Sequence, residues 1–439
     1  MGATMRGRRA GLWLLCILSA VCAAGSAAAA GTTAADDAAA KAAHQAVHAS
    51  ARGSVLEVAT LATYRRDAIE AGLGSRAGFI GRPRCDVTLS RVTYATIGVH
   101  GEPATASAML LLPGGPDCGE PHELLGWAQG TQTRRDASQA DDTLAAGDSP
   151  LLTFYAARGV AVAATDYLGL GRSDYPFHPY LHAESEASAI VDALRAARRV
   201  AGEARIPLSG KVLLAGYSQG GHASMAAQRT IERDHAGEFH LAGTAPMSGP
   251  YALEQTFIDG WSAAGPAGPN GLATALFAYA VVAMQRVYGT IYASPADVFR
   301  SPFDATVEGF MPGRLDIFDV LRQGVLPPGP EIARLRQDGF TRSFDDPQAP
   351  FRRALAGNDL LDWTPRAPMV LCGAGRDAVV PFANTLTAKR LFTGHGAAVE
   401  VLDMDDRIPA ELDGVSVHTS AAVYLCFGAT RDRLLALAR

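Results

Sequence analysis

The sequence predicts a three-layer α/β domain with a mostly parallel sheet and a mostly helical cap insertion. Residues 160–166, VAVAATD, are almost uninterruptedly apolar, which is typical of a parallel strand buried on both faces. Residues 184–200 carry apolar side chains at helical spacing, which predicts the crossover helix of a βαβ unit. Residues 249–367 are too many for a loop and contain long apolar helical runs, so we expect a cap; a separate domain of unrelated purpose is the alternative.

The composition is that of a globular protein with a substantial core. Of its 439 residues 48% are hydrophobic and 19% are charged. The net charge is −5, and no block of lysine or arginine follows the first ten residues. A nucleic-acid binder would need such a basic patch, so we exclude nucleic acid as a partner.

The N-terminus has the pattern of a secretory signal peptide over residues 1–30. Arginines within residues 6–9 precede an apolar run at 11–24 and a small-residue stretch at 25–30. The apolar run is shorter than the ~20 residues of a membrane-spanning helix, which disfavours a permanent anchor. Lipoprotein anchoring at Cys22 is also disfavoured, since bulky Val21 precedes it. We therefore expect export, cleavage and a secreted or periplasmic protein.

Two segments precede the core strands. The Ala-rich stretch after the signal peptide is predicted to be a linker. Residues 55–71 are predicted to form an amphipathic segment that packs through Leu56, Leu61, Tyr64 and Ile69. We accordingly divide the chain into signal peptide, linker, first part of the core, cap and second part of the core, at residues 1–30, 31–54, 55–248, 249–367 and 368–439.

Two strands, residues 87–99 and 104–112, are predicted to form a hairpin turning at Gly101-Glu102. Cys85 and Cys118 lie symmetrically about this turn, so we expect them to form a disulfide, which an oxidising compartment would preserve. Two separately packed thiols are the alternative. The sequence leaves open whether Cys372 and Cys426 are paired.

The motif Gly216-Tyr217-Ser218-Gln219-Gly220 follows the apolar strand residues 212–215 and precedes a helix-compatible run at 222–233. Small residues on both sides of a serine suit a sharp strand-to-helix turn that exposes a nucleophilic hydroxyl. An ordinary Gly-rich turn is the alternative. Ser218 is the candidate nucleophile.

Together with Asp166-Tyr167-Leu168-Gly169-Leu170-Gly171 and the hairpin segment 92–113, this motif resembles α/β-hydrolases of the secretory lipase and esterase type. The resemblance runs from about residue 87 to residue 422. It implies an eight-stranded-type core, a cap over the site, ester hydrolysis without a metal or organic cofactor, and a Ser, acid, His order along the chain.

The acid of this order should follow a late strand. Asp377 lies in a loop after the predicted strand 368–372 and is our candidate. Asp403, Asp405 and Asp406 follow the next strand, where a solvated acidic loop explains them.

Two histidines follow Asp377. His395 precedes the predicted strand 397–404 and His418 follows it, and ligands of open α/β sheets bind at the carboxyl ends of strands. We therefore assign His418 as the base and His395 as an exposed turn residue. His222, at the start of the helix after Ser218, is expected to pack or to cap that helix.

The oxyanion formed during acyl transfer needs two fixed donors. The first is expected to be the backbone N–H of Gln219. The second is expected from the loop after the predicted strand 122–129, by position Thr131. Relatives often carry His-Gly in this loop, whereas this chain has Gln129-Gly130.

The sequence therefore indicates a secreted carboxylic ester hydrolase acting on small-molecule or lipid esters through an acyl-enzyme. The apolar segment 273–284, with Phe277 and Met284, either packs on the core or forms the acyl-binding wall, and the cap is expected to contact lipid interfaces transiently. A peptidase or amidase with the same triad is the main alternative. A non-catalytic binding protein is a weaker one because the triad is intact, and the serine disfavours a haloalkane dehalogenase.

Overall fold

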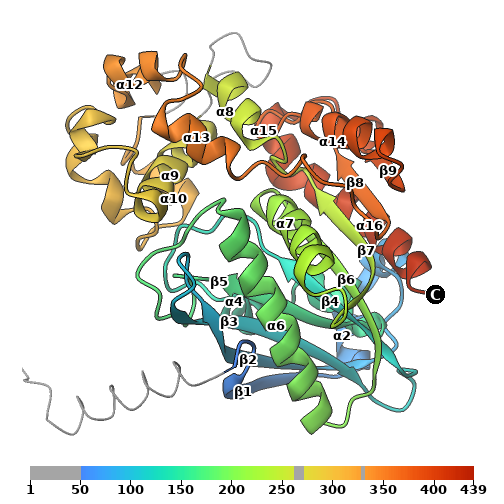
Figure 1. Ribbon diagram of the computed structural model, residues 1–439. Helices are drawn as coiled ribbons and strands as arrows, with labels where there is room; N and C mark the ends of the chain where they lie inside the picture. The colour runs from blue at the N-terminus through green and yellow to red at the C-terminus, as the bar shows by residue number, and fades with distance from the viewer. Residues whose placement is uncertain (1–50, 262–270, 328–331) are drawn as a thin grey trace, which may run out of the picture. The chain divides into compact units, whose positions relative to one another are not determined.

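A computed structural model describes residues 51–261, 271–327 and 332–439 (Figure 1). The predicted signal peptide and most of the predicted linker lie outside the described residues. The described part contains one nine-stranded sheet. Its strands are β1 (Val55–Tyr64), β2 (Asp86–Ile97), β3 (Pro103–Gly114), β4 (His122–Ala128), β5 (Ala161–Tyr167), β6 (Leu208–Tyr217), β7 (His240–Met247), β8 (Met369–Gly373) and β9 (Val399–Asp403).

The sheet has the strand order β1-β2-β3-β5-β4-β6-β7-β8-β9. The pairs from β1 to β5 are antiparallel, and the remaining pairs, from β5–β4 to β8–β9, are parallel. The mostly parallel α/β architecture is thus confirmed, with one strand more than the eight expected. The additional strand is β1, at the edge.

Strand β1 also corrects the prediction for residues 55–71. The segment is a strand followed by helix α2 (Arg66–Leu73), and Leu56 is 38% exposed rather than a packing residue. Ile69 is buried, and Leu61 and Tyr64 are half-buried. An edge strand has a neighbour on one side only, so it does not need the continuous apolar run of an inner strand.

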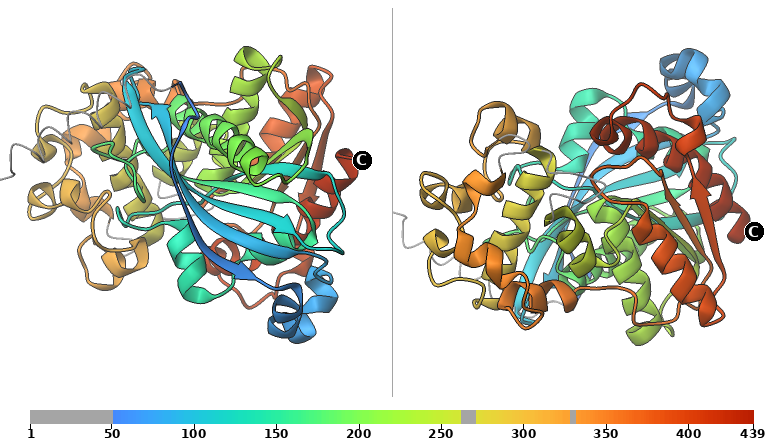
Figure 2. Two further views of the ribbon diagram at one scale, coloured as in Figure 1. Left: turned by 90° about the horizontal axis from the view of Figure 1, so that it is seen from below. Right: turned by 90° about the horizontal axis from the view of Figure 1, so that it is seen from above.

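The helices outside the insertion form the layers on the two faces of the sheet (Figures 1 and 2). One face is covered by α6 (Ala183–Glu203), α7 (Gln219–Asp234) and α14 (Ala383–Gly394), and the other by α2, α4 (Gln139–Ala146), α5 (Pro150–Phe154) and α16 (Ala422–Leu437). Short helices α3 (Ala77–Ile80) and α15 (Gly414–Ser416) complete this set.

Strand β6 shows why its sequence is continuously apolar. Val212 and Leu214 belong to the core beneath α6 and α7, whereas Leu213 and Ala215 belong to the core on the opposite face. All four side chains are fully buried. Successive side chains of a strand point to opposite faces, so a strand covered on both faces has no polar positions.

The predicted hairpin and disulfide are confirmed. Strands β2 and β3 pair in register from Asp86 with Gly114 to Ile97 with Pro103. Cys85 and Cys118, just beyond the open end of the hairpin, form a disulfide with Cα atoms 4.4 Å apart. A second disulfide joins Cys372 of β8 to Cys426 of α16.

The segment between β7 and β8 is helical and lies at one end of the sheet, coloured yellow to orange in Figure 1. It has its own apolar core, which also includes Val379 and Val380 of the hydrolase core. Its helices are α8 (Leu253–Trp261), α9 (Gly271–Tyr288), α10 (Ile317–Arg322), α11 (Ile332–Leu335), α12 (Asp338–Ser343) and α13 (Pro350–Ala356). We call this insertion the cap.

Helix α9 is the central helix of the cap. By length and composition it could cross a membrane, but 67% of its apolar window is buried inside the protein. Its Tyr279 hydroxyl donates to the carbonyl of Gln132 at 3.0 Å, in the loop after β4. An all-round apolar helix is therefore explained by packing inside the cap and against the core.

Candidate active site

Ser218 lies at the sharp turn between β6 and α7. Its backbone has φ 60° and ψ −120°, which is strained for a residue with a side chain. A Cβ on Gly216 would lie 2.1 Å from the carbonyl oxygen of Gly220, and a Cβ on Gly220 would lie 2.0 Å from that of Ala128. The two glycines of the motif are therefore required by close backbone approach. The Ser218 N–H donates to the carbonyl of Met247 at 2.9 Å, which ties the turn to the end of β7.

The structure brings the three predicted triad residues together. His418 Nε2 lies 3.0 Å from Ser218 Oγ, and His418 Nδ1 lies 2.7 Å from Asp377 Oδ2. A carboxylate oxygen only accepts, so Nδ1 carries the hydrogen, and Nε2 of the neutral ring can accept from the serine hydroxyl. Asp377 and His418 are 6% and 4% exposed, whereas Ser218 is half-buried.

Asp377 is held by its own loop after β8. Its Oδ1 accepts hydrogen bonds at 2.9 Å from the backbone N–H groups of both Val379 and Val380. These two donors fix the carboxylate and direct Oδ2 toward His418. Asp405, one of the rival acids, instead pairs with Arg376 at 3.1 Å.

His418 lies in a π-helical turn, residues Val417–Ala421, directly before α16. π-turns are rare and are frequently found at functional sites. The hydroxyl of Tyr217 donates to the His418 carbonyl at 2.8 Å, so the residue before Ser218 also holds the backbone of His418. Sequence reasoning did not assign this role to Tyr217. His395, at the end of α14, is exposed as predicted.

The two predicted oxyanion donors come from different parts of the chain. Gln219 is the first residue of α7, so its backbone N–H has no acceptor within the helix. Thr131 lies in the loop after β4 and lines the same cavity, of about 220 Å³, as Ser218 and His418. The Thr131 hydroxyl lies 2.9 Å from the hydroxyl of Tyr180, and this hydrogen bond orients the Thr131 side chain.

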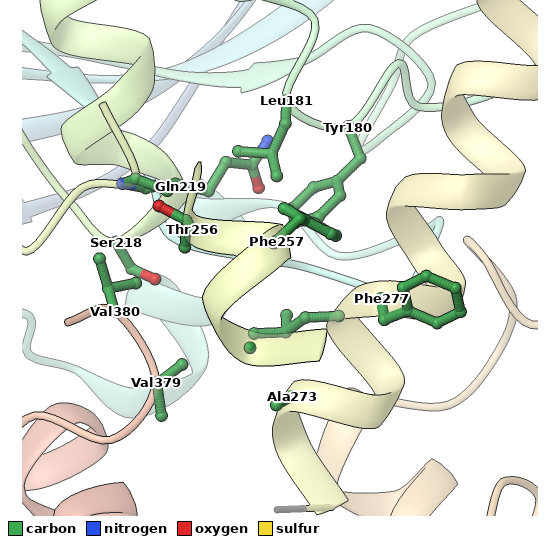
Figure 3. Close-up of a pocket in the computed structure, with 13 residues that line it drawn as sticks. Tyr180, Leu181, Ser218, Gln219, Thr256, Phe257, Ala273, Phe277, Val379 and Val380 are labelled. Carbon is green, nitrogen blue, oxygen red and sulfur yellow. The ribbon is translucent and has the colours of Figure 1, made fainter. Parts of the chain in front are cut away.

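A second, smaller cavity of about 80 Å³ adjoins Ser218 under the cap (Figure 3). Phe257 of α8 and Phe277 of α9 contribute to its wall, opposite Val379 and Val380 of the acid loop. Most of the lining is apolar. Met284 does not line either cavity at Ser218, and it lies fully buried beside the amide of Asn358, 3.8 Å from Nδ2.

His222 packs in the interior and does not cap the helix. It is fully buried, with Nδ1 at 2.8 Å from Glu186 Oε2 and Nε2 at 2.9 Å from the carbonyl of Asn358. Of the two expected roles, packing therefore holds and helix capping does not, because the ring contacts Glu186 of α6 and Asn358 beyond α13, which the local sequence does not reveal.

Comparisons with known proteins bear on the family and the fold. The family model described as secretory lipase matches residues 135–269, and a search of curated proteins finds no match. The structure is similar to that of the rice cell wall degrading esterase LipA from Xanthomonas oryzae, with TM-score 0.84 and 45% identity over 89% of this chain and 100% of that chain.

More distant structures share the fold. A protein from Legionella pneumophila has TM-score 0.75 and 24% identity over 88% of this chain and 98% of that chain. Candida antarctica lipase A in its closed state has TM-score 0.61 and 18% identity over 87% and 83% of the two chains. At these identities the likeness concerns the fold alone. The similarity to LipA is much stronger, with 45% identity over 89% of this chain. The chain therefore belongs to the secretory lipase family, as a carboxylic ester hydrolase with the α/β-hydrolase fold.

Proposed function

We propose that the chain is a secreted serine esterase in which Ser218 is the nucleophile, His418 the general base and Asp377 the orienting acid. The observation that carries the proposal is the unbroken hydrogen-bonded sequence from the Asp377 carboxylate through His418 to the Ser218 hydroxyl. This arrangement is the requirement for activating a serine hydroxyl at neutral pH.

In the proposed reaction, Ser218 Oγ attacks the acyl carbon of the ester while its proton passes to His418 Nε2. The carbonyl oxygen becomes an oxyanion and accepts hydrogen bonds from the backbone N–H groups of Gln219 and Thr131. Collapse of this intermediate expels the alcohol, which takes the proton from Nε2, and leaves an acyl-enzyme. Water then repeats the cycle, and Asp377 stabilises the imidazolium through Nδ1–H in both halves.

The two cavities at Ser218 suggest how the ester is placed. The leaving alcohol must lie near His418, which lines the larger cavity with Thr131. The acyl group then occupies the smaller apolar cavity beneath the cap, against Phe257 and Phe277. A covered apolar site also limits the access of competing water to the reacting ester.

The test uses p-nitrophenyl esters from acetyl to palmitoyl beside aminoacyl p-nitroanilides, together with a fluorophosphonate label. Ser218→Ala should lose turnover and labelling with unchanged far-UV circular dichroism. The matched control is Ser224→Ala, which removes a buried hydroxyl of α7 that donates to the Gly221 carbonyl at 3.1 Å, and it should keep both. Labelling of Ser218→Ala would exclude Ser218 as the nucleophile.

The same assay separates the alternatives. Preference for the anilides would favour a peptidase or amidase over an esterase. Absence of both turnover and labelling in the wild type would favour a binding protein.

We further propose that the esterase acts outside the cytoplasm, as a family described as secretory and a relative that degrades the rice cell wall suggest. Two disulfides are typical of such a compartment. N-terminal sequencing of the exported protein should place the cleavage within or just after residues 25–30. Recovery of the intact N-terminus in the membrane fraction would indicate an anchor instead.

A further inference from the structure

A buried polar network lies behind the nucleophile and is not used by the triad. It consists of His178, Glu186, Gln219, His222 and Asn358, each at most 1% exposed. Glu186 belongs to α6, Gln219 and His222 to α7, His178 to the loop after β5, and Asn358 to the segment after α13. Buried charged and polar groups are costly unless they are fully paired, so their concentration beside Ser218 needs an explanation.

The hydrogen bonds of Gln219 are determined by its neighbours. Burial lowers the pKa of His178 to about 4, so the ring is neutral at ordinary pH. Its Nδ1 lies 2.9 Å from the carbonyl of Leu168 and must donate, so its Nε2 accepts from Gln219 Nε2 at 2.8 Å. The other hydrogen of the amide goes to Glu186 Oε1 at 2.8 Å. Gln219 Oε1 has no partner within the described residues, so the two donated bonds alone fix the side chain.

His222 completes the network through both ring nitrogens. Its Nδ1 faces Glu186 Oε2 at 2.8 Å and its Nε2 faces the Asn358 carbonyl at 2.9 Å. The carbonyl only accepts, so Nε2 carries a hydrogen, and one proton is shared between Nδ1 and Glu186 Oε2. Each Glu186 oxygen therefore has one hydrogen-bond partner, Gln219 at Oε1 and His222 at Oε2.

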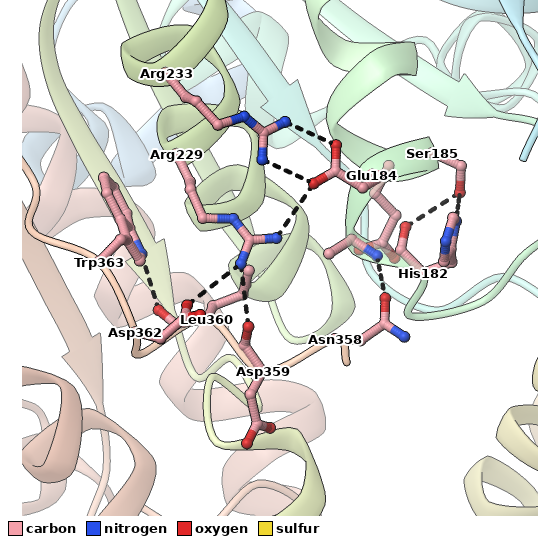
Figure 4. A network of polar contacts seen from close by, with 12 residues as sticks. His182, Glu184, Ser185, Arg229, Arg233, Asn358, Asp359, Leu360, Asp362 and Trp363 are labelled. Atoms are coloured by element: carbon pink, nitrogen blue, oxygen red, sulfur yellow. Dashed lines mark hydrogen bonds and ion pairs between the residues drawn. The ribbon is translucent and has the colours of Figure 1, made fainter. Parts of the chain in front are cut away.

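The same unit reaches the cap. Figure 4 shows Asn358 beside the start of α6, where its Oδ1 accepts from the Ala183 N–H at 2.8 Å. Its Nδ2 donates to the hydroxyl of Tyr288, the last residue of the cap helix α9, at 2.8 Å. The Glu186–His222 pair thus connects the first turn of α7 with the base of the cap.

We propose that Glu186, paired with His222, is a positioning residue that holds the oxyanion donor Gln219. Ser218 and Gln219 are adjacent, and a strained backbone persists only where surrounding contacts fix it. The pair fixes the Gln219 side chain from the far side of the turn, and so fixes the direction of its backbone N–H. This inference rests on the proposed function, in which that N–H binds the oxyanion.

The first test is Glu186→Gln. An amide has a single acceptor oxygen, so the variant cannot accept from both Gln219 and His222. With p-nitrophenyl acetate we expect kcat to fall about tenfold or more with KM nearly unchanged, less than the ~10² to 10³ that follows loss of an oxyanion donor itself. The Ki for phenylboronic acid, whose serine adduct places an oxygen in the oxyanion site, should rise by a similar factor.

Gln219→Met is the second variant, because it removes the side-chain amide and leaves the backbone N–H in place. It should show the same fall in kcat and rise in Ki, which keeps the proposal testable if Glu186→Gln folds poorly. Asp192→Asn is the matched control. Asp192 is also a fully buried carboxylate of α6, but its partners are Arg52, Thr96 and Arg195, which do not belong to this network. It should lower Tm and keep kcat.

The outcomes separate the two proposals. Turnover by Ser218→Ala would overturn the proposed function, whatever the other variants do. If Ser218→Ala is inactive while Glu186→Gln and Gln219→Met keep kcat and Ki within twofold of the wild type, the positioning role is wrong and the network is structural. A kcat loss in Asp192→Asn equal to that in Glu186→Gln would also overturn the positioning role.

Discussion

The two disulfides should differ in their effect on catalysis although they stabilise the fold to a similar extent. Cys85–Cys118 closes a sequence separation of 33 residues and Cys372–Cys426 one of 54. The loop-entropy relation gives about 4 kcal/mol for each at these separations. The four cysteines are also all buried, so their replacement by alanine has similar consequences for packing.

Their positions relative to the triad are different. Cys372 lies on β8, five residues before Asp377, and Cys426 lies on α16, eight residues after His418. This disulfide therefore joins the strand that precedes the Asp377 loop to the helix that follows the His418 turn. Cys85–Cys118 instead closes the end of the β2–β3 hairpin, which carries no triad residue.

The double variants Cys372→Ala/Cys426→Ala and Cys85→Ala/Cys118→Ala should therefore each lose about 4 kcal/mol of unfolding free energy in urea, if entropy of the unfolded chain dominates. Only the first should also lower kcat for p-nitrophenyl acetate, by about tenfold, because a misplacement of about 1 Å between triad groups has large effects on rate. The assay is run well below the unfolding midpoint of either variant. Equal kcat values in the two variants would refute the reasoning that this disulfide aligns the triad.

Three further outcomes are expected. Asp377→Asn should reduce kcat by about 10⁴, as in the best-studied serine triad, and a tenfold effect or less would shift the role to another acid. Phe277→Ala should change the preference between short and long acyl esters by about 1 to 3 kcal/mol in kcat/KM, whereas Met284→Ala should lower Tm with an unchanged preference; equal losses at all chain lengths for Phe277→Ala would contradict an acyl-wall role. Burial raises the pKa of Asp166 from 3.8 to about 6, so the folded protein binds this proton more tightly than the unfolded chain does. The free energy of unfolding of the wild type therefore falls as the pH rises from about 4 to about 6. Relative to Asp166→Asn, the wild type should lose about 2 kcal/mol of unfolding free energy between pH 4 and pH 7, and a constant difference in urea titrations would disprove this.

The sequence was sufficient for the parts of the fold that depend on local pattern. The apolar runs of β5 and β6 and the periodicity of α6 predicted a parallel sheet with helices on both faces, because a strand without polar positions must be covered twice. The order of Ser218, Asp377 and His418 along strands and loops also placed these three residues at one end of the sheet, where the structure brings them into contact.

Other features could not be read from local pattern. Strand β1 carries exposed residues such as Leu56 and Val58, since an edge strand is only partly covered, and its sequence did not identify it as a strand. Met284 and Phe277 belong to the same apolar helix, and only the packing of the cap decides which of them lines the cavity. The pairing of Cys372 with Cys426 likewise depends on how α16 packs on β8.

The turn at Ser218 depends partly on its own sequence motif and partly on residues far away in the chain. The glycines at 216 and 220 allow the close approach of backbones, and this requirement is visible in the motif itself. A non-glycine residue at φ 60° and ψ −120° is nevertheless unfavourable by about 1 to 3 kcal/mol, so a sequence motif alone does not keep Ser218 there. The contacts that fix the turn come from Met247, from Glu186 and from Asn358 through His222, which are 29, 32 and 140 residues from Ser218 in the sequence. Glu186 lies in the first turn of α6, where a glutamate is ordinarily exposed and interacts favourably with the helix dipole. Only its buried contact with His222 indicates another role. The motif is therefore sufficient to propose Ser218 as the nucleophile, whereas the groups proposed to hold it in position become visible only when α6, α7 and the end of the cap are seen together.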